Sequence, residues 1–382
     1  MSAECGIKQE FLRDIFRSWR LYILKITFVL PGLGTSGGKK VVFEYAKLLK
    51  ERGHDISVIY PVIPMQPGKH WYEYKRIAKT MLGTGLHLGG VFKNYWANLN
   101  DNLLMAPSLS EKHMPDADII IATWWKTADY VSSYNIRKGK KFYLIQGYEI
   151  WGGPKEKVEM SYKSGLRNIV ISNWLKNILE NLGATVNAVV PNGINSDEFY
   201  PEKVRRGNKD KIRILMPYRR QVFKGFRDGL RAYEIVAEKY KNTQLVLFGP
   251  RPGIREIPKN YEFHLFPMKD DLRMLYCSCD IFLFPSHHEG FGLPPMEAMA
   301  CGLPVVTTDV GAITDYSIPG KTALVSPPHN PDALAQNMMR LLENEQERRT
   351  LAEEGFDYIK NFTWEQSVQT LENIFLKAYG DK

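Results

Sequence analysis

Two glutamates, Glu289 and Glu297, stand eight positions apart around the glycine-containing turn Gly-Phe-Gly (290–292) and a proline pair. The preceding residues DIFLFPS predict a buried strand, and PPMEAMACG predicts a helix with proline in its first turn and glycine at its end. A strand-to-helix loop offers free backbone N–H groups and the positive end of the helix dipole, which together suit a phosphate. A carboxylate beside a phosphate is better suited to binding hydroxyl groups. We therefore expect a ligand that carries both.

A structural alternative is that both glutamates only complement the helix dipole. This explains Glu297, which we expect in the first helical turn, better than Glu289, which precedes the helix.

Two cations follow another predicted strand, in the segment MPYRRQVFKGFRDGLRAY (216–233). Arg219 would place a fork of donors on two phosphate oxygens, and Lys224 would act as a point charge. Basic loops are common, so this signal gains weight only beside a phosphate-binding helix in the same sheet.

The order of elements predicts an α/β protein of two domains. Residues 25–61 read as strand, glycine loop, amphipathic helix and strand, which opens a parallel sheet. A charged, irregular stretch at 196–210 is the expected domain boundary. Further strands are expected at 116–125, 140–149, 166–172, 211–218, 243–250, 261–267, 279–286 and 304–310, and a final amphipathic helix in the last 20 residues. Residues 187–203 read as a last strand of the first domain followed by a polar exit.

Two segments are basic and aromatic. Residues 1–23 have apolar side chains at helical spacing with Lys and Arg between them, which favours either docking on an anionic membrane or packing on the domain behind. Residues 62–115 read as an insertion, whose stretch 64–96 would face a membrane, an acceptor, or nothing more than the domain surface as a helical flap.

The composition limits the class of protein. The 382 residues carry a net charge of +9, which suggests anionic partners, but no nucleic-acid-binding module is recognisable. The four cysteines have no metal-ligand spacing, so we expect a reduced, cytoplasmic protein. No apolar run approaches the roughly 20 residues that span a bilayer.

The sequence resembles the retaining glycosyltransferases of family 4, which have the GT-B fold. The element from Glu289 to Glu297, inside EGFGLPPMEAMACGLPVV, looks like the most specific signature of that family, and Arg219-x4-Lys224-Gly225 is also similar. So are VPNGINSDEF (190–199) and TALVSPPHNPDALAQNM (322–338), and the resemblance covers most of the chain.

The resemblance implies two Rossmann-like domains that face each other across a cleft. The first, 1–200, would bind the acceptor and be completed by 363–382, because the final helix crosses back to it. The second, 201–362, would bind a nucleoside-diphosphate sugar.

The resemblance also implies residue roles. Arg219 and Lys224 would neutralise the diphosphate, and Glu297 would hold the ribose. Glu289 would lie at the donor sugar, near the backbone of Gly290, Phe291, Gly292 and Leu293. The glycines Gly37 and Gly38 would let the first domain approach the donor phosphates.

One residue departs from the family pattern. Gln146 stands where members often carry a histidine, and glutamine cannot shuttle a proton at neutral pH. The leaving diphosphate could take the acceptor's proton instead. Further residues expected on the acceptor or sugar side are Tyr148, Glu149 and His288. Trp124 and Trp125 end a predicted strand of the first domain, so they would either line the acceptor side or pack in the core.

The expected activity is transfer of a hexosyl group to an acceptor hydroxyl, with the anomeric configuration kept. The acceptor would be a glycan or lipid-linked molecule of the cell envelope, met on the cytoplasmic face of the membrane. No cofactor and no metal ligands are expected, since KDDL (269–272) leads into a helix and offers no convincing Asp-x-Asp loop.

Three alternatives remain at this level. An NAD-dependent oxidoreductase would explain Gly32-x-Gly34-x-x-Gly37, but it needs an acidic residue at the end of the second strand, where none stands. A sugar-nucleotide epimerase would need acid and base groups that the first domain scarcely offers. A non-catalytic sugar-nucleotide-binding protein is the third. The donor base, the sugar and the oligomeric state cannot be read from the sequence.

Overall fold

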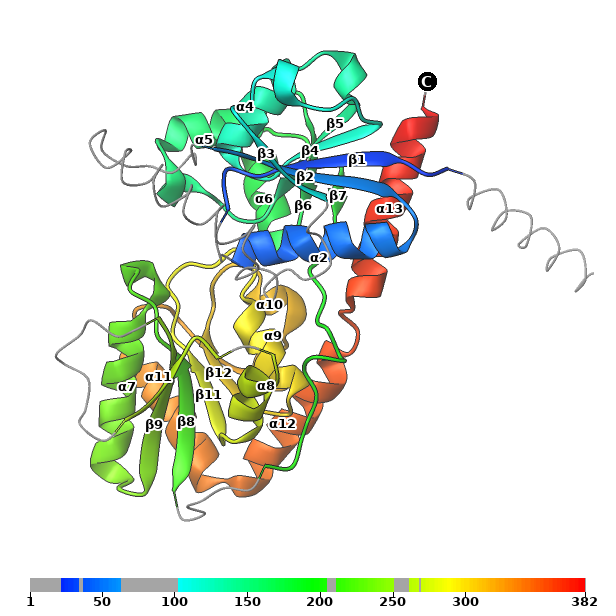
Figure 1. Cartoon of the computed structure of the whole chain (residues 1–382). Coiled ribbons are helices and arrows are strands. Elements are labelled where there is room, and N and C mark those ends of the chain that lie inside the picture. The colour runs from blue at the N-terminus through cyan, green and yellow to red at the C-terminus, as the bar shows by residue number, and fades with distance from the viewer. Residues whose placement is uncertain are drawn as a thin grey trace, which may run out of the picture. The chain divides into compact units, whose positions relative to one another are not determined.

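The computed structural model of the chain describes residues 22–33, 37–62, 102–204, 211–250, 261–267 and 269–381 (Figure 1). These residues form two compact units. The first contains the described residues up to Ile169, Leu179–Ala188 and the segment from Val368 onward, and the second contains Val170–Ile178 and the residues from Val189 to Ser367. Along the chain, the first crossing from one unit to the other comes between Ile169 and Val170.

A seven-stranded sheet organises the first part of the chain, with strand order β3-β2-β1-β4-β5-β6-β7. The strands are β1 Lys25–Val29, β2 Asp55–Pro61, β3 Leu103–Ala106, β4 Ile119–Ala122, β5 Lys140–Ile145, β6 Arg167–Val170 and β7 Ala188–Val189. The pairs from β3 through β5 are all parallel. A parallel sheet needs apolar side chains on both faces, and β4 is accordingly the fully buried run IIIA.

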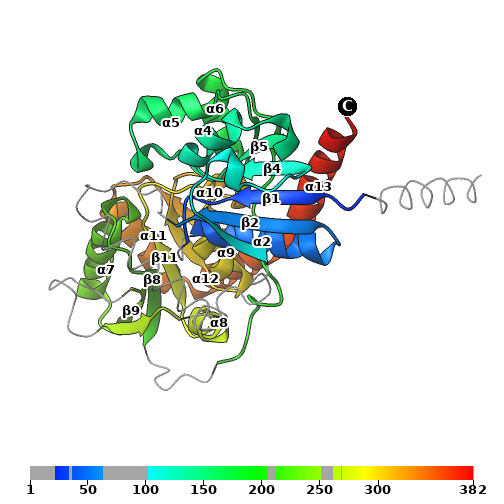
Figure 2. The same ribbon diagram turned by 45° about the horizontal axis from the view of Figure 1, so that its top comes forward.

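Helices lie on both sides of this sheet, with α2 opposite α4 and α5 (Figures 1 and 2). The helices are α2 Gly37–Glu51, α4 Trp125–Ser133, α5 Lys155–Ser161, α6 Asn173–Asn181 and α13 Trp364–Gly380. Short 3-10 turns are η3 Glu111–His113, η4 Ile136–Lys138 and η5 Ile150–Gly152.

The last helix, α13, packs on the first unit. The rings of Phe142 and Phe375 meet edge to face with centroids 5.1 Å apart, and neither is exposed to solvent. Glu372 Oε1 lies 2.9 Å from His54 Nε2, and its Oε2 accepts a hydrogen bond of 2.8 Å from Arg52 Nε. The end of the chain therefore completes the core that its beginning starts.

The second unit is built on a six-stranded parallel sheet of order β10-β9-β8-β11-β12-β13. Its strands are β8 Ile212–Pro217, β9 Thr243–Gly249, β10 Glu262–Leu265, β11 Ile281–Phe284, β12 Val305–Thr308 and β13 Leu324–Ser326. The chain starts in the middle, winds to one edge and returns, so the direction of winding reverses between β8 and β11. In such sheets ligands bind beyond the carboxyl ends of the strands at this reversal.

The helices of the second unit pack on both faces of its sheet, α7 and α11 on one and α8, α9 and α12 on the other (Figures 1 and 2). They are η6 Val222–Lys224, α7 Phe226–Lys239, α8 Asp270–Cys277, α9 Leu293–Ala300, α10 Ile313–Tyr316, α11 Pro331–Glu343 and α12 Glu345–Ile359. The core beneath α7 and α11 contains buried aliphatic and aromatic side chains, among them Leu230, Val236, Leu334 and Met338.

The predicted α/β class with two parallel sheets is confirmed, but several boundaries are corrected. The predicted insertion 62–115 contains a strand of the sheet, β3, which pairs with β2; its residues 63–101, like 1–21, lie outside the described residues. The last strand of the first domain, expected within 187–203 ahead of a polar exit, is β7 and has two residues, and β13 is a strand that the sequence pattern did not indicate.

The predicted strand 116–125 also ends early, at Ala122. Thr127 Oγ1 accepts hydrogen bonds of 3.0 Å from the backbone N–H groups of Thr123 and Trp124, and these bonds start a helix at Trp125 instead. Among the described helices, none is long and apolar enough to span a membrane.

Candidate active site

The loop from β11 to α9 is shaped by one glycine in the left-handed region. Gly292 is the N-cap of α9, with φ 87°. A Cβ there would lie 2.9 Å from Tyr316 Oη and 3.0 Å from Ile313 Cδ1, so a side chain would be excluded by space as well as by backbone conformation. Tyr316 Oη donates a 2.7 Å hydrogen bond to the Gly292 carbonyl and fixes the entry into the helix.

Glu289 is a buried carboxylate with two donors on the same oxygen. Its residue is 8% exposed, and Oε1 accepts from Ser286 Oγ at 2.7 Å and from Lys224 Nζ at 2.8 Å. A buried charge is tolerated only when it is paired and hydrogen-bonded, and both conditions are met. Glu289 is thus held in one position rather than simply exposed at a helix end.

Lys224 comes from the neighbouring strand-to-helix crossing. It ends the turn η6 after β8, and β8 pairs with β11 in the sheet. The next residue, Gly225, has φ 64°, and a Cβ there would come within 1.8 Å of the Pro285 carbonyl oxygen. This close approach brings the lysine, whose side chain is 25% exposed, against the loop that carries Glu289.

Arg219 follows β8 by two residues and is half-buried. Its Nη1 donates a 3.0 Å hydrogen bond to the Tyr218 carbonyl, and a Cβ on Gly249, at the end of β9, would lie 2.7 Å from that same nitrogen. The guanidinium thus lies at the carboxyl edge of the sheet, where a glycine leaves room for it.

Glu297 is tied to a tyrosine that the sequence did not indicate. It is 7% exposed, and Oε2 accepts a 3.0 Å hydrogen bond from Tyr276 Oη on α8. Burial raises the pKa of Tyr276 well above its ordinary value and the charge of Glu297 raises it further, while Arg219 acts in the opposite direction. Tyr276 therefore stays protonated and serves as a donor.

The expectation that Glu297 lies in the first turn of its helix is wrong. The first turn of α9 begins at Leu293 and contains no acidic residue. Glu297 stands one turn further in, so complementing the helix dipole does not explain it. The other features of α9 are confirmed: prolines follow its first residue, and Gly302 with φ 71° comes directly after its C-cap.

The other predicted residues of the loop between β11 and α9 differ in how far they are buried. Phe291 is buried against Tyr316, with ring centroids 5.2 Å apart. Leu293 is half-buried, and Gly290 is half-buried beside Glu289. The His288 ring lies edge-on to Phe223, at 6.3 Å. Asp270 and Asp271 lie in the first turn of α8, as expected of residues that lead into a helix.

In the first unit, Gly37 and Gly38 begin α2. A Cβ on Gly38 would lie 3.3 Å from Gln146 Oε1, so a side chain would crowd that glutamine. Gln146 Oε1 is buried and has no hydrogen-bond partner among the described residues. Lys39, also in the first turn of α2, has its pKa lowered to about 8 by burial.

Trp124, Trp125 and Glu149 are buried in the first unit and do not end a strand on its surface. Glu149 Oε2 accepts hydrogen bonds from Trp125 N at 3.0 Å and from Tyr143 Oη at 3.1 Å. Burial raises the pKa of Glu149 to about 8, although both of those hydrogen bonds lower it. The carboxyl thus caps α4 from a distance.

Tyr148 is half-buried and donates its hydroxyl to Glu159 Oε1. Burial and this hydrogen bond raise the pKa of Tyr148 to about 12, so it remains a neutral phenol.

Sequence reasoning missed Ser286, Tyr276 and Tyr316, the three hydroxyl donors that fix the two glutamates and their loop. Ser286 lies three residues before Glu289, and this short spacing could have indicated their contact. Tyr276 and Tyr316 come from α8 and α10, and no sequence pattern linked them to the glutamates or their loop.

Comparison with known proteins places a family match in the second unit. Residues 197–357 match the model of glycosyl transferases group 1. A region of 106 residues is 36% identical to the O-antigen chain mannosyltransferase B of Escherichia coli, covering 28% of this chain and 27% of that protein. An uncharacterized glycosyltransferase of Methanocaldococcus jannaschii is 34% identical over 106 residues, 28% of this chain and 30% of that one. The chain thus matches less than a third of the length of these curated relatives.

Solved structures match over nearly the whole chain. Sucrose-phosphate synthase from Thermosynechococcus elongatus has a TM-score of 0.69 at 18% identity, covering 94% of this chain and 100% of that one. The HepE protein of Anabaena in complex with UDP-glucose has a TM-score of 0.69 at 14% identity, covering 93% and 100%. With its two parallel-sheet α/β units, this chain has the GT-B fold, and its second unit carries the segment that matches the glycosyl transferases group 1.

Proposed function

We propose that this protein is a retaining glycosyltransferase of family 4 that moves a hexosyl group from a nucleoside-diphosphate sugar to an acceptor hydroxyl. The observation that carries the proposal is the contact between Lys224 and Glu289. It lies beyond β8 and β11, the two strands between which the winding of the second sheet reverses. It puts a cation and a buried carboxylate side by side at the edge where open α/β sheets bind ligands.

The cations fit the charge that develops in such a reaction. As the bond from the sugar to the diphosphate breaks, negative charge grows on the diphosphate oxygens. Arg219 and Lys224 lie at the carboxyl edge of the sheet, and α9 begins there with the backbone N–H of Leu293, whereas Pro294 and Pro295 have none. Preorganised donors aimed at developing charge are worth about 3–4 kcal/mol each.

The carboxylates fit the hydroxyl groups of the donor. Glu289 would accept from the hydroxyls of the sugar, and Glu297 from those of the ribose. Ser286, Lys224 and Tyr276 supply the remaining hydrogen bonds that keep both carboxylates oriented before the donor arrives. Such preorganisation reduces the entropy that binding costs.

The proton of the acceptor hydroxyl would pass to the leaving diphosphate. The acceptor oxygen forms its bond to the anomeric carbon as the bond from that carbon to the diphosphate oxygen breaks. The diphosphate oxygen then takes the acceptor's proton. Gln146 could only orient a hydroxyl, because an amide does not accept a proton at neutral pH. We propose that no metal ion takes part, since Arg219, Lys224 and the loop amides neutralise the diphosphate.

The acceptor we propose is a glycan or lipid-linked molecule in cell-envelope polysaccharide synthesis. Among the similar proteins are an O-antigen mannosyltransferase and a capsular polysaccharide biosynthesis glycosyltransferase of Staphylococcus aureus, the latter 27% identical over 42% of this chain and 45% of its own. The basic, aromatic sequences 1–23 and 64–96 would hold the enzyme on the cytoplasmic membrane face. Co-sedimentation with anionic liposomes, by the full chain but not by a variant without residues 1–23, is the expected result.

A donor screen tests the proposal. The protein is incubated with UDP-, GDP- and dTDP-sugars in the presence of a chelator, and thermal stability and slow donor hydrolysis are measured. A ligand that binds only the folded state raises its stability by mass action. We expect one nucleotide class to stabilise the protein, and Lys224→Ala and Glu297→Ala to weaken this effect.

Stabilisation without any hydrolysis or transfer would instead indicate a non-catalytic sugar-nucleotide-binding protein. No stabilisation by any nucleotide would contradict the donor site itself.

A further inference from the structure

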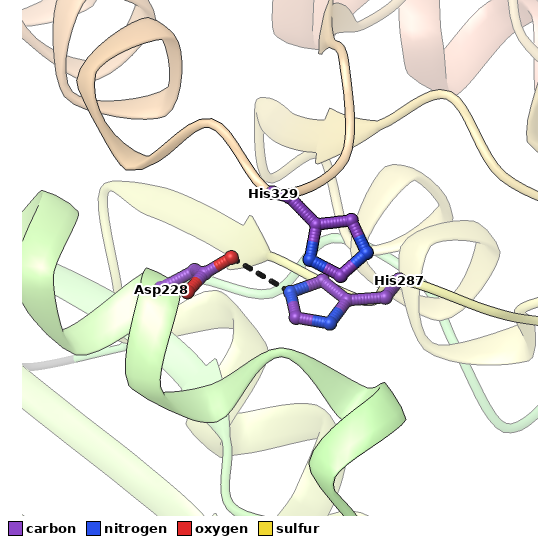
Figure 3. A group of neighbouring side chains, drawn as sticks. All are labelled: Asp228, His287 and His329. Atoms are coloured by element: carbon purple, nitrogen blue, oxygen red, sulfur yellow. Dashed lines mark hydrogen bonds and ion pairs between the residues drawn. The ribbon is translucent and has the colours of Figure 1, made fainter.

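A second group of side chains in the same unit has a composition suited to a metal ion. Asp228, His287 and His329 each offer one ligand atom, and these atoms all lie within 4.8 Å of one another. Asp228 Oδ2 and His287 Nε2 are 2.7 Å apart, and the rings of His287 and His329 have centroids 3.7 Å apart. Figure 3 shows that each imidazole turns one ring nitrogen toward Asp228.

The three residues come from separate, well-held elements. Asp228 lies in the first turn of α7. His287 lies in the loop after β11, where its backbone N–H donates a 2.9 Å hydrogen bond to the Phe223 carbonyl. His329 directly precedes Asn330, whose side chain caps α11 by accepting from Ala333 N at 2.9 Å. A ligand bound by all three would tie two helices and one loop together.

His329 has an unfavourable backbone conformation. Its φ is 59°, one of three positive values among the described residues other than glycine. Glycine would adopt this conformation without strain, so an imidazole here has a cost in backbone energy. Among the described residues, the ring contact that the structure gives this imidazole is with His287.

We propose that Asp228, His287 and His329 form a binding site for a divalent transition-metal ion, zinc by preference. Two imidazole nitrogens and one carboxylate oxygen suit this borderline ion, with water as the fourth ligand. The metal would take the place of the proton between His287 and Asp228, which is released to water, and the three ligand atoms would lie about 2.0–2.2 Å from it.

The site is distinct from the proposed donor chemistry, although it shares a loop with it. His287 stands between Ser286 and Glu289, which are hydrogen-bonded to each other. A metal ion at His287 would therefore restrain the loop that orients Glu289. Binding of the metal ion does not depend on glycosyl transfer, so it can be measured without any sugar donor.

Titration of the purified, metal-free full chain with Co²⁺ tests the proposal, because cobalt bound by nitrogen and oxygen ligands absorbs visible light. The variants are His329→Gly, which removes the ligand and suits the positive φ, and Asp228→Asn. The control is His264→Gln. His264 also pairs with a carboxylate, since its Nε2 lies 2.6 Å from Glu262 Oε1, but that carboxylate already has Arg213 as a partner. Zn²⁺ is then added to displace the cobalt.

We expect the wild type and the His264→Gln control each to bind one tightly held ion more than either variant does. The absorption band of the bound cobalt should disappear when zinc is added. Zinc should also raise the melting temperature of the wild type more than that of His329→Gly. Equal binding by all four proteins would place any metal on other residues and overturn the proposal. So would the absence of binding to the wild type.

Discussion

Lys224 Nζ and Glu289 Oε1 lie 2.8 Å apart although 65 residues separate them in sequence. The contact joins the 3-10 turn after β8 to the loop after β11, and these two strands are neighbours in the sheet. Lys224 is a quarter exposed, whereas Glu289 is buried, so an incoming anion can reach the lysine while the carboxylate keeps its hydrogen bond from Ser286. The pair is thus arranged for a ligand that approaches from the lysine side.

Lys224→Ala should lower kcat by about 10²–10³-fold, because it removes one preorganised donor from the developing diphosphate charge. Gln146→Ala should lower it much less if the diphosphate itself takes the acceptor's proton. Steady-state transfer to the identified acceptor measures both. Lys321→Ala is the matched control, since Lys321 forms a surface pair with Glu354 at 3.5 Å. Equal losses for Lys224→Ala and Gln146→Ala would argue against the proposed proton path.

Tyr276→Phe should weaken donor binding by about tenfold, because a hydrogen bond to a charged group contributes about 1.5–3 kcal/mol. Tyr276 positions Glu297, so KM for the donor should rise while kcat changes little. Tyr233→Phe is a suitable control, since Tyr233 is also a buried tyrosine of the second unit and its hydroxyl lies 3.5 Å from the Thr243 carbonyl. A fall in kcat with unchanged KM would mean that Glu297 acts on the reacting sugar instead.

Glu149 makes the stability of the first unit depend on pH. Burial raises its pKa from 4.5 to about 8, so the folded state binds a proton that the unfolded state has released. Stability is therefore highest below the unfolded pKa and falls as pH rises toward about 8.

Glu149→Gln should remove this dependence. Relative to the wild type, the variant should gain melting temperature between about pH 5 and about pH 8, by an amount that reflects about 1.4 kcal/mol for each unit of pKa difference. Thermal melts across this range measure it, with exposed Glu156→Gln as the control. A difference between wild type and Glu149→Gln that stays constant with pH would show that Glu149 is ionised in the folded state.

Phe375→Ala should destabilise the first unit by about 3–5 kcal/mol, because it leaves a cavity beside Phe142. Hydrogen exchange should accelerate in β4 and β5 and remain unchanged in β8 and β11. Tyr379→Ala, on the exposed face of the same helix, should have little effect. Acceleration confined to the second unit would contradict the packing of α13 described above.

The sequence was informative where a pattern is local. The run IIIA, the glycine after α9 and the prolines at its start each report on their immediate neighbours, and those elements were predicted correctly. The predicted helix began at Pro294, whereas α9 begins one residue earlier, at Leu293, so Glu297 falls just beyond the first turn.

Contacts between distant segments could not be predicted. Trp125 and Glu149 meet across 24 residues, and Tyr276 and Glu297 across 21, and neither pair has a spacing that a helix or strand imposes. Glu149 was expected on the acceptor or sugar side, and in the structure its carboxyl is buried and accepts a hydrogen bond from the first residue of α4. Burial, which decides between these roles, depends on tertiary packing.

The arrangement of α13 sets an order for folding during synthesis. Phe375 is translated about 230 residues after Phe142, which at about 5–20 residues per second takes roughly ten to fifty seconds. During that time the residues from Val189 to Ser367, which make up most of the second unit, emerge from the ribosome and can fold, while the first unit still has an open apolar surface. Chaperones that bind nascent chains should therefore associate with the beginning of this protein for longer than with its middle.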